Sequence, residues 1–357
     1  MDVATANPQS PLPAPLRVAE SWTSIWARRA ISIPLYTLLT ALYVLGAPLW
    51  LLAVALADLL AGQYQTWPRT RALGFFGLYL TCEVAGVAVA TAVWTATLGG
   101  RFGGPERYLQ ANATLQRWWT AALFHGTVWL FSIRVQVEGL ELAKAGPLLL
   151  FVRHAASSDT VLAAALVANP NRLLLRYVLK RELLWDPCLD IVGRRLPNSF
   201  VDRNSPRRRG ELDAIAQLGH GLDARSAVLI YPEGTRFSAK KLASGLDALR
   251  TRKEDRLLAI AAQFSHVLPP KPGGALALLQ AAPQADVVFL EHAGLEGAAT
   301  FDRFWRGGLI GQTLRVRLRR FEAASIPAQD RDLWLFERWA ELDAWIGQSA
   351  VHQDKTP

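Results

Sequence analysis

Two long apolar segments near the N-terminus constrain what this chain can fold into. Residues 31–57 include no charged side chain. As an α-helix this segment would be about 40 Å long, which is enough to cross a bilayer with some tilt. A second segment, residues 72–100, is interrupted only by Glu83. A short link joins the two, so we expect a two-helix hairpin in the membrane.

The charges around the two segments set the expected orientation. Five arginines flank the hairpin: Arg28 and Arg29 precede it, and Arg101, Arg107 and Arg117 follow it. The link between the two segments has two, Arg69 and Arg71. Because cytoplasmic flanks carry the excess of Arg and Lys, we expect an integral membrane protein with its remaining part on the cytoplasmic face. A shallow hairpin held in one leaflet is the alternative, and it predicts the same exposed face.

Glu83 is the one charged residue inside the second apolar segment. A carboxylate that faced lipid would be costly. The side chain either makes a polar contact near a substrate path or turns toward a neighbouring helix, and we favour the second alternative.

The composition agrees with partial burial in lipid. Hydrophobic residues make up 51% of the chain and charged residues 19%, which is too apolar for an ordinary soluble enzyme. The net charge of +9 favours anionic partners, such as a phosphorylated substrate, coenzyme A or an anionic membrane surface. Nucleic acid is not favoured, since no nucleic-acid-binding module is visible. Cys82 and Cys188 cannot form a disulfide framework, and we interpret both as buried thiols.

Beyond residue 104, short apolar runs alternate with helical patterns. Strands are predicted at residues 134–137, 148–152, 173–179, 227–231, 286–290 and 314–318, and helices at 160–167, 211–218 and 331–347. Residues 200–201 are predicted to start a loop. Strands separated by helices indicate an α/β fold with a mostly parallel central sheet flanked by helices.

The predicted organisation therefore has five parts. These are a mobile N-terminal tail (1–30), the two-helix membrane anchor (31–100), a linker with an interfacial helix (101–134), the α/β domain (135–325), and a C-terminal amphipathic helix with a tail (326–357).

The most informative motif follows the predicted strand at 148–152. His154 stands five positions before Asp159, and the serines at 157 and 158 are further candidates to cap a helix. Five residues turn an ideal helix by about 140°, so the two side chains can meet only if His154 lies in the loop before the helix. Histidine suits a general base near neutral pH, and a carboxylate on its other ring nitrogen fixes the tautomer. Taken alone, Asp159 could equally be a helix cap and His154 an ordinary loop residue.

A second motif, Glu233-Gly234-Thr235-Arg236, closes the predicted strand at 227–231. It supplies a tight glycine turn, exposed backbone donors and a guanidinium group. Arginine binds phosphate oxygens in a bidentate manner, so the motif is typical of a phosphate-binding loop.

At this spacing, and behind an apolar N-terminus, the two motifs resemble the glycerolipid acyltransferase family, the lysophosphatidic-acid and lysophospholipid acyltransferases. The resemblance covers roughly residues 130–325 and implies that this is the acyltransferase domain. It implies His154 as the base, Asp159 as its orienting partner, and the motif at 233–236 as the block that binds the acceptor's phosphate, although Glu233 would alternatively hold the loop. The acidic residues often found beside the family's His and Asp are replaced here by small ones at 155–158.

Further blocks are similar to those of the same family. Residues 200–203, Phe-Val-Asp-Arg, map the family's second phosphate-contacting arginine to Arg203, and Lys180 matches the lysine that precedes this block. Residues 267–272, Val-Leu-Pro-Pro-Lys-Pro, match the fourth block weakly.

Basic residues outside these motifs have two interpretations. Arg315, Arg317 and Arg319 alternate along a predicted strand, which gives one basic face. This face is either solvated or in contact with anionic lipid or the phosphates of coenzyme A, and the cluster at 207–209 leaves the same choice open.

The resemblance implies an O-acyltransferase that moves a fatty acyl group from acyl-CoA or acyl carrier protein to the hydroxyl of a lysophospholipid. The simplest acceptor is 1-acyl-glycerol-3-phosphate, which would give phosphatidic acid. No metal and no bound cofactor is implied, and nothing in the pattern points to a particular oligomer. The alternatives are transfer or transacylation to another lysolipid, hydrolysis of a lipid or thioester, and a non-catalytic lipid-binding role. No Gly-x-Ser-x-Gly nucleophile elbow is present to favour the hydrolase.

Overall fold

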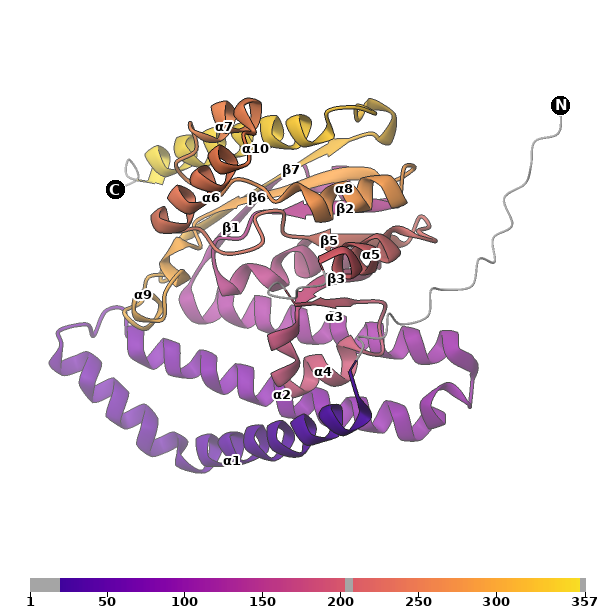
Figure 1. Ribbon diagram of the computed structural model, residues 1–357. Coiled ribbons are helices and arrows are strands. Elements are labelled where there is room, and N and C mark those ends of the chain that lie inside the picture. The colour runs from indigo at the N-terminus through magenta and orange to yellow at the C-terminus, as the bar shows by residue number, and fades with distance from the viewer. Residues whose placement is uncertain (1–19, 203–207, 354–357) are drawn as a thin grey trace.

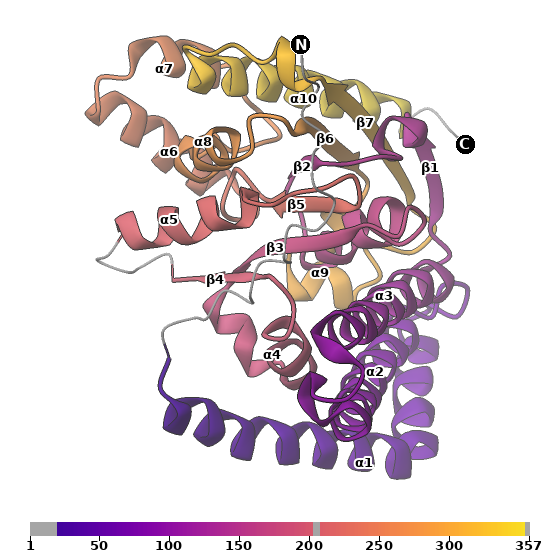
Figure 2. The same cartoon turned by 90° about the vertical axis from the view of Figure 1, so that its right-hand side faces the viewer.

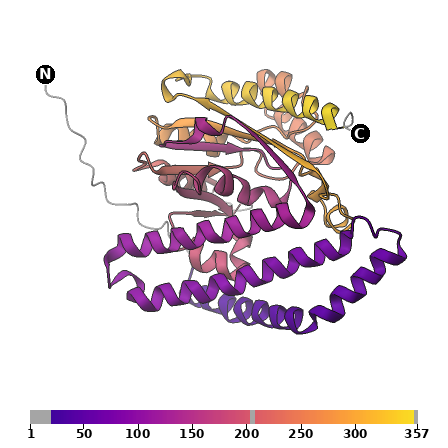
Figure 3. The ribbon, with the colours of Figure 1, turned by 180° about the vertical axis from the view of Figure 1, so that it is seen from behind.

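The computed structural model describes residues 20–202 and 208–353, so most of the predicted tail, residues 1–19, lies outside the described part, as do residues 354–357. Three long helices come first: α1 (Trp22–Leu60), α2 (Pro68–Thr97) and α3 (Gly104–Phe131). α2 packs against both α1 and α3. Figures 1 and 3 show the three helices stacked beneath the sheet in the order α3, α2, α1.

A seven-stranded sheet forms the centre of the remaining chain. Its strands are β1 (Arg134–Glu138), β2 (Leu148–Val152), β3 (Leu174–Lys180), β4 (Ser199–Val201), β5 (Ser226–Ile230), β6 (Asp286–Ala293) and β7 (Thr313–Phe321). They lie in the order β1-β7-β6-β2-β5-β3-β4, and of these neighbouring pairs only β6 and β7 are antiparallel. The predicted α/β fold with a mostly parallel sheet is therefore confirmed.

The central strands are apolar because both faces of the sheet are covered. Every residue of β2 and of β5 is buried, as expected for parallel strands between two helical layers. Leu148 and Leu150 of β2 pack on the side of α3, whereas Leu149 and Phe151 pack on the opposite side, against helices later in the chain. Core packing on both faces of the sheet thus fixes β2, the strand that precedes His154.

The helices of the domain vary in length. They are α4 (Pro187–Gly193), α5 (Arg208–Gly219), α6 (Ala239–Thr251), α7 (Asp255–Ala261), α8 (Pro272–Ala281), α9 (Phe301–Trp305) and α10 (Arg331–Gln353). Shorter 3-10 turns are η1 (Leu98–Gly100), η2 (Leu140–Ala143), η3 (Ser157–Val161), η5 (Arg181–Trp185), η6 (Glu296–Ala298) and η7 (Ala323–Ser325), and η4 (Ala164–Ala168) is a π-helix.

One local prediction is wrong, and another differs in helix type. Residues 200–201 do not start a loop but belong to β4, a three-residue edge strand that pairs only with β3. So short a strand carries little pattern of its own and forms because β3 offers its free edge. The segment predicted as a helix at 160–167 is helical, but it consists of the 3-10 turn η3 followed by the π-helix η4 and is not a regular α-helix.

The outer face of the hairpin is an exposed apolar surface. α1 and α2 are both long and apolar enough to cross a membrane, and the most apolar part of α1 is 0% buried. Leu38, Leu42, Leu45, Leu49 and Leu52 are each more than half exposed. Their spacing of three and four residues places them on one side of the helix. α1 therefore presents a continuous stripe of leucine away from the α/β domain.

Polar contacts attach the hairpin to α4, which Figure 2 shows between the sheet and the long helices. Asp190 of α4 is fully buried and accepts hydrogen bonds from Arg28 (2.9 Å) and Arg29 (2.6 Å) at the start of α1. Glu83 accepts hydrogen bonds from the Trp119 indole (2.9 Å) and from the Cys188 backbone (3.0 Å). Glu83 thus turns toward its neighbouring helices, as favoured from the sequence.

The alternating arginines of β7 do not form a solvated or lipid-facing basic surface. Arg317 and Arg319 both donate to the carboxylate of Glu291 on β6, at 2.6 Å and 2.7 Å. The guanidinium of Arg317 also lies 4.9 Å from the ring centre of Trp345 in α10. α10 covers this face, so both interpretations drawn from the sequence are wrong for these two residues.

Candidate functional site

The motif residues follow strands that end at one edge of the sheet. β2, β5 and β3 are parallel neighbours, and they end at Val152, Ile230 and Lys180. In α/β folds, ligands bind outside the carboxyl ends of such strands. The loops that follow β2 and β5 therefore lie where a substrate is expected.

The structure brings His154 and Asp159 together. His154 lies in the loop after β2, and Asp159 lies in η3, so the two side chains meet as their spacing predicted. Nδ1 of His154 is 3.0 Å from Oδ1 of Asp159 and 3.3 Å from Oδ2. Asp159 is fully buried, whereas the His154 side chain is 13% exposed. Nδ1 is engaged by the carboxylate, which leaves Nε2 as the ring nitrogen that can accept a proton from a substrate.

The carboxylate of Asp159 is itself held by the backbone. Its Oδ2 accepts the N–H groups of Ala155 at 2.7 Å and Ala156 at 2.9 Å. With the imidazole on the other side, the carboxylate accepts three hydrogen bonds. Asp159 is not the N-cap of η3, which is Ala156, but its carboxylate accepts the N–H of that residue and contacts His154 at the same time.

The second motif forms a tight turn beside His154. Gly234 donates its N–H to the carbonyl of Tyr231 at 2.9 Å and has a φ of +70°, a conformation that favours glycine. The ring of Tyr231 lies 4.7 Å from the ring of His154. The backbone N–H of Phe237 donates to the carbonyl of His154 at 3.3 Å. The two motifs are thus joined directly, although about seventy residues separate them along the chain.

Glu233 joins three segments of the site. Its Oε1 accepts the backbone N–H of His154 at 3.1 Å, and its Oε2 accepts that of Leu268 at 3.0 Å. Burial raises the pKa of Glu233 to about 7. The positive charge of Arg153 and the two backbone N–H groups lower this pKa, but their effect is smaller than that of burial. The proline-rich block at 267–272 meets the turn again, where Lys271 N–H donates to the carbonyl of Pro232 at 2.8 Å. Glu233 therefore holds the loops together, which is the alternative role considered for it.

Thr235 and Arg236 lie at the outer part of the turn. The Thr235 hydroxyl accepts from the ammonium of Lys241 at 2.9 Å, and the same ammonium lies 3.0 Å from the carbonyl of Arg236. Nη1 of Arg236 lies 3.5 Å from the carbonyl of Ala299, in the segment after β6. Both side chains are partly exposed. Cationic groups from two segments gather at this turn, which suits an anionic ligand.

The remaining predicted residues are more distant or outside the described part. Lys180 is the last residue of β3 and pairs with Val201 of β4, so β5 separates its strand from β2. Arg203 lies outside the described residues, one position beyond Asp202. The phosphate roles of Lys180 and Arg203 stay predictions, as do the roles of the other motif residues.

A buried layer behind the dyad was not predicted. Nη1 of Arg153 donates to Glu296 at 2.7 Å and to the carbonyl of His292 at 2.6 Å. His292 lies within β6 and is fully buried. The signal in the sequence was the appearance of charged and ring-nitrogen side chains at the end of an otherwise apolar strand.

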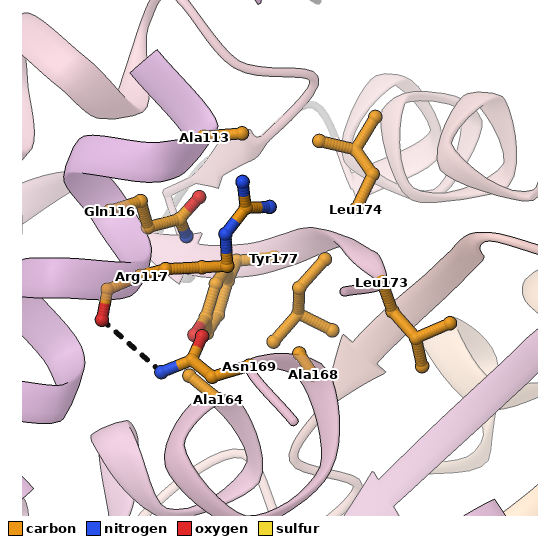
Figure 4. A pocket seen from close by; sticks show the side chains of 10 residues that line it. Ala113, Gln116, Arg117, Ala164, Ala168, Asn169, Leu173, Leu174 and Tyr177 are labelled. Atoms are coloured by element: carbon orange, nitrogen blue, oxygen red, sulfur yellow. Dashed lines mark hydrogen bonds between the residues drawn. The ribbon is translucent and has the colours of Figure 1, made fainter. Parts of the chain in front are cut away.

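The described part of the structure has two further cavities, and neither is lined by His154 or Asp159. A cleft of about 480 Å³ lies between the start of α1 and η5; it is lined by Glu20, Ser24, Ala27, Arg28, Ile31, Arg181, Glu182, Leu184, Trp185 and Asp202. A space of about 10 Å³, room for roughly one water, lies between α3 and η4. Figure 4 shows it beside Tyr177, with the Asn169 amide donating to the Arg117 carbonyl at 3.2 Å. Within residues 20–202 and 208–353, no group of His, Cys, Asp and Glu side chains is arranged to hold a metal ion.

Comparisons with known proteins agree with this architecture. Residues 134–289 match the family model described as Acyltransferase. No curated protein sequence matches the chain. The fold is similar to the crystal structure of the 1-acyl-sn-glycerophosphate (LPA) acyltransferase, PlsC, from Thermotoga maritima, with a TM-score of 0.52 and 14% sequence identity over 80% of this chain and 96% of that chain. Residues 134–289 therefore match the acyltransferase family model, and this match supports the resemblance to the glycerolipid acyltransferases drawn from the motifs.

Proposed function

We propose that this protein transfers a fatty acyl group from a thioester donor, acyl-CoA or acyl carrier protein, to the hydroxyl of a lysophospholipid. The first candidate acceptor is 1-acyl-glycerol-3-phosphate, and phosphatidic acid would be the product. The observation that carries this proposal is the hydrogen bond between His154 and Asp159 at the sheet edge, joined directly to the turn at Glu233. The His154–Asp159 pair lies beside a turn with cationic side chains, and this arrangement supports the esterification of a phosphate-bearing acceptor.

The proposed reaction needs no covalent intermediate with the protein. Nε2 of His154 takes the proton of the acceptor hydroxyl as its oxygen attacks the thioester carbonyl. The Asp159 carboxylate stabilises the imidazolium that forms. Collapse of the tetrahedral intermediate breaks the carbon–sulfur bond, and the imidazolium returns its proton to the thiolate. The products are the ester and the free thiol, and the base is regenerated.

The assay that tests this function uses purified protein in detergent, a labelled acyl-CoA or acyl carrier protein, and a panel of lysolipids. Labelled phospholipid formed by wild type but not by His154→Ala would support the proposal, and the best acceptor would define the substrate. Free fatty acid as the only product would identify a hydrolase instead. The absence of any product with either donor would favour a non-catalytic lipid-binding role.

Arg236→Ala tests the phosphate role of the turn. Loss of a charge-assisted hydrogen bond should raise the KM for phosphate-bearing acceptors by about 10- to 100-fold. The KM for a phosphate-free acceptor, measured in the same assay, should stay within about threefold. Arg250→Ala on α6 is the matched control, since Arg250 pairs with Asp247 at an exposed position. Equal losses with both kinds of acceptor would remove the phosphate role from Arg236.

We further propose that the hairpin is inserted into one leaflet and keeps the domain on the cytoplasmic face. Two contacts support this arrangement. The start of α1 is bound to α4 through Asp190, and near the link Phe76 of α2 lies 6.2 Å from Phe301 of α9, ring centre to ring centre. A hairpin that crossed the bilayer would carry its link to the far side, away from the domain.

A labelling experiment distinguishes the two topologies. In sealed vesicles, an impermeant thiol reagent should modify Ala61→Cys in the link from the same side as Ser244→Cys on α6. Both positions are exposed, and the native thiols Cys82 and Cys188 are buried. Modification of Ala61→Cys only from the opposite side would show that the hairpin spans the bilayer.

A further inference from the structure

Arg153 and His292 form a reciprocal pair directly behind His154. Nε2 of His292 donates to the carbonyl of Arg153 at 3.0 Å, and Nη1 of Arg153 donates to the carbonyl of His292 at 2.6 Å. The last paired residues of β2 and β6 are Val152 and Leu290. The two hydrogen bonds therefore extend the contact between β2 and β6 beyond their last paired residues, into the loop that carries His154.

The same imidazole reaches Asp159. Nε2 of His292 lies 3.6 Å from Oδ2 of Asp159, and both side chains are fully buried. This oxygen already accepts the N–H groups of Ala155 and Ala156. The His292 N–H is thus hydrogen-bonded to the Arg153 carbonyl, and the carboxylate of Asp159 lies next to it. Its partial positive charge favours the observed position of that carboxylate.

His292 is suited to be a neutral donor of fixed orientation. Burial lowers the pKa of His292, and Arg153 lowers it further, while Asp159, Glu296 and the hydrogen bond to the Arg153 carbonyl oppose this. Since Nε2 is the donor, the neutral ring carries its proton there. Nδ1 of His292 is buried without a hydrogen-bond partner among the described residues, so a second proton would be unsatisfied.

Arg153 is fixed from the other side. Its guanidinium also donates to Glu296 at 2.7 Å and to the carbonyl of His266 at 3.1 Å. Glu296 accepts in addition the N–H of Gly294 at 2.7 Å. The backbone at His266 is held by Asp343 of α10, which accepts its N–H at 2.6 Å. The arginine is thereby tied to three separate segments and cannot turn away without breaking buried hydrogen bonds.

We propose that His292, paired with Arg153, is a positioning residue for acyl transfer: it fixes the Asp159 carboxylate and the backbone before His154 so that Nε2 of His154 faces the acceptor hydroxyl. This inference rests on the proposed function, since it assigns a role within the same site. His292 does not touch the substrate and acts only through Asp159 and the loop. Small displacements of a catalytic group cost about 10²-fold in rate, so the effect should be measurable in kcat.

The test compares His292→Leu with His292→Gln. Leu removes the donor and should lower kcat by about 10- to 100-fold, with the KM of donor and acceptor within about twofold. The side-chain amide of Gln can donate from nearly the position of Nε2 and should return kcat to within about threefold of wild type. When Asp159→Asn is already present, adding His292→Leu should lower kcat by less than about twofold, because His292 acts through the carboxylate that this variant lacks.

Val288→Ala is the matched control, since Val288 is a fully buried residue of β6 away from the pair. It should lower the melting temperature and leave kcat unchanged. If His292→Leu does not fold, His292→Asn takes its place, because its shorter side chain withdraws the donor while remaining polar. An active wild type with unchanged kcat in the Leu or Asn variant would overturn the inference, as would equal losses for Leu and Gln. A wild type without transferase activity would instead refute the proposed function.

Discussion

His154→Ala should lower kcat for acyl transfer by about 10²- to 10⁴-fold, the usual contribution of a general base. The reason is geometric as well as chemical. The ring is held by Asp159 at Nδ1 and packs beside Tyr231, so its Nε2 is fixed at the edge of the sheet. Alanine removes the proton acceptor and leaves the backbone hydrogen bonds of residue 154 to Glu233 and Phe237 in place. Turnover with the best lysolipid, followed by labelled product, measures the loss.

His220→Ala is the control for this variant. His220 is exposed and lies between two glycines, so its removal should leave turnover within about twofold of wild type. The melting temperature of His154→Ala should equal that of the wild type. A variant that kept more than half of the activity would remove His154 from the role of base.

Asp159→Asn should lower kcat by about 10³- to 10⁴-fold, comparable to the loss of the orienting aspartate in serine hydrolase triads. The carboxylate accepts three N–H groups, from the His154 ring and from the backbone of Ala155 and Ala156. An amide has only one oxygen, so its NH₂ group must face at least one of these donors. Asn therefore favours the imidazole tautomer with its proton on Nε2, which cannot accept the hydroxyl proton.

The matched control is Asp286→Asn, at the opposite end of β6. Asp286 accepts the backbone N–H of Ala323 and a hydrogen bond from Arg320. Its substitution perturbs a carboxylate of the same sheet without touching the dyad, so kcat should be unchanged. The double variant His154→Ala with Asp159→Asn should be no slower than His154→Ala alone, since the two residues act as a unit. Additive losses would contradict the dyad.

The central sheet could be predicted because its strands carry their own signal. The apolar runs of β2 and β5 predict strands from the local sequence alone, and in the structure both faces of these strands pack in the core. The meeting of His154 with Asp159 was equally accessible, since the two residues lie in one short segment and only one local geometry brings them together.

The layer behind the dyad could not be predicted in the same way. Arg153 and His292 are 139 residues apart, and their pairing depends on β2 and β6 becoming neighbours in the sheet. The hydrophobic periodicity of a sequence does not show which strands will be neighbours in a sheet. The same limit explains Arg317 and Arg319, whose alternation indicated a basic face but could not show that Glu291 and α10 cover it.

The attachment of α1 to α4 implies an order of assembly during synthesis. Arg29 leaves the ribosome 161 residues before Asp190, the carboxylate that it binds in the finished protein. The apolar helices are therefore synthesised long before their polar partners, and in the proposed one-leaflet arrangement lipid is the first environment that can shield them. On that proposal, the α/β domain completes its fold against a hairpin that is already in place, and the contact between Arg29 and Asp190 forms last.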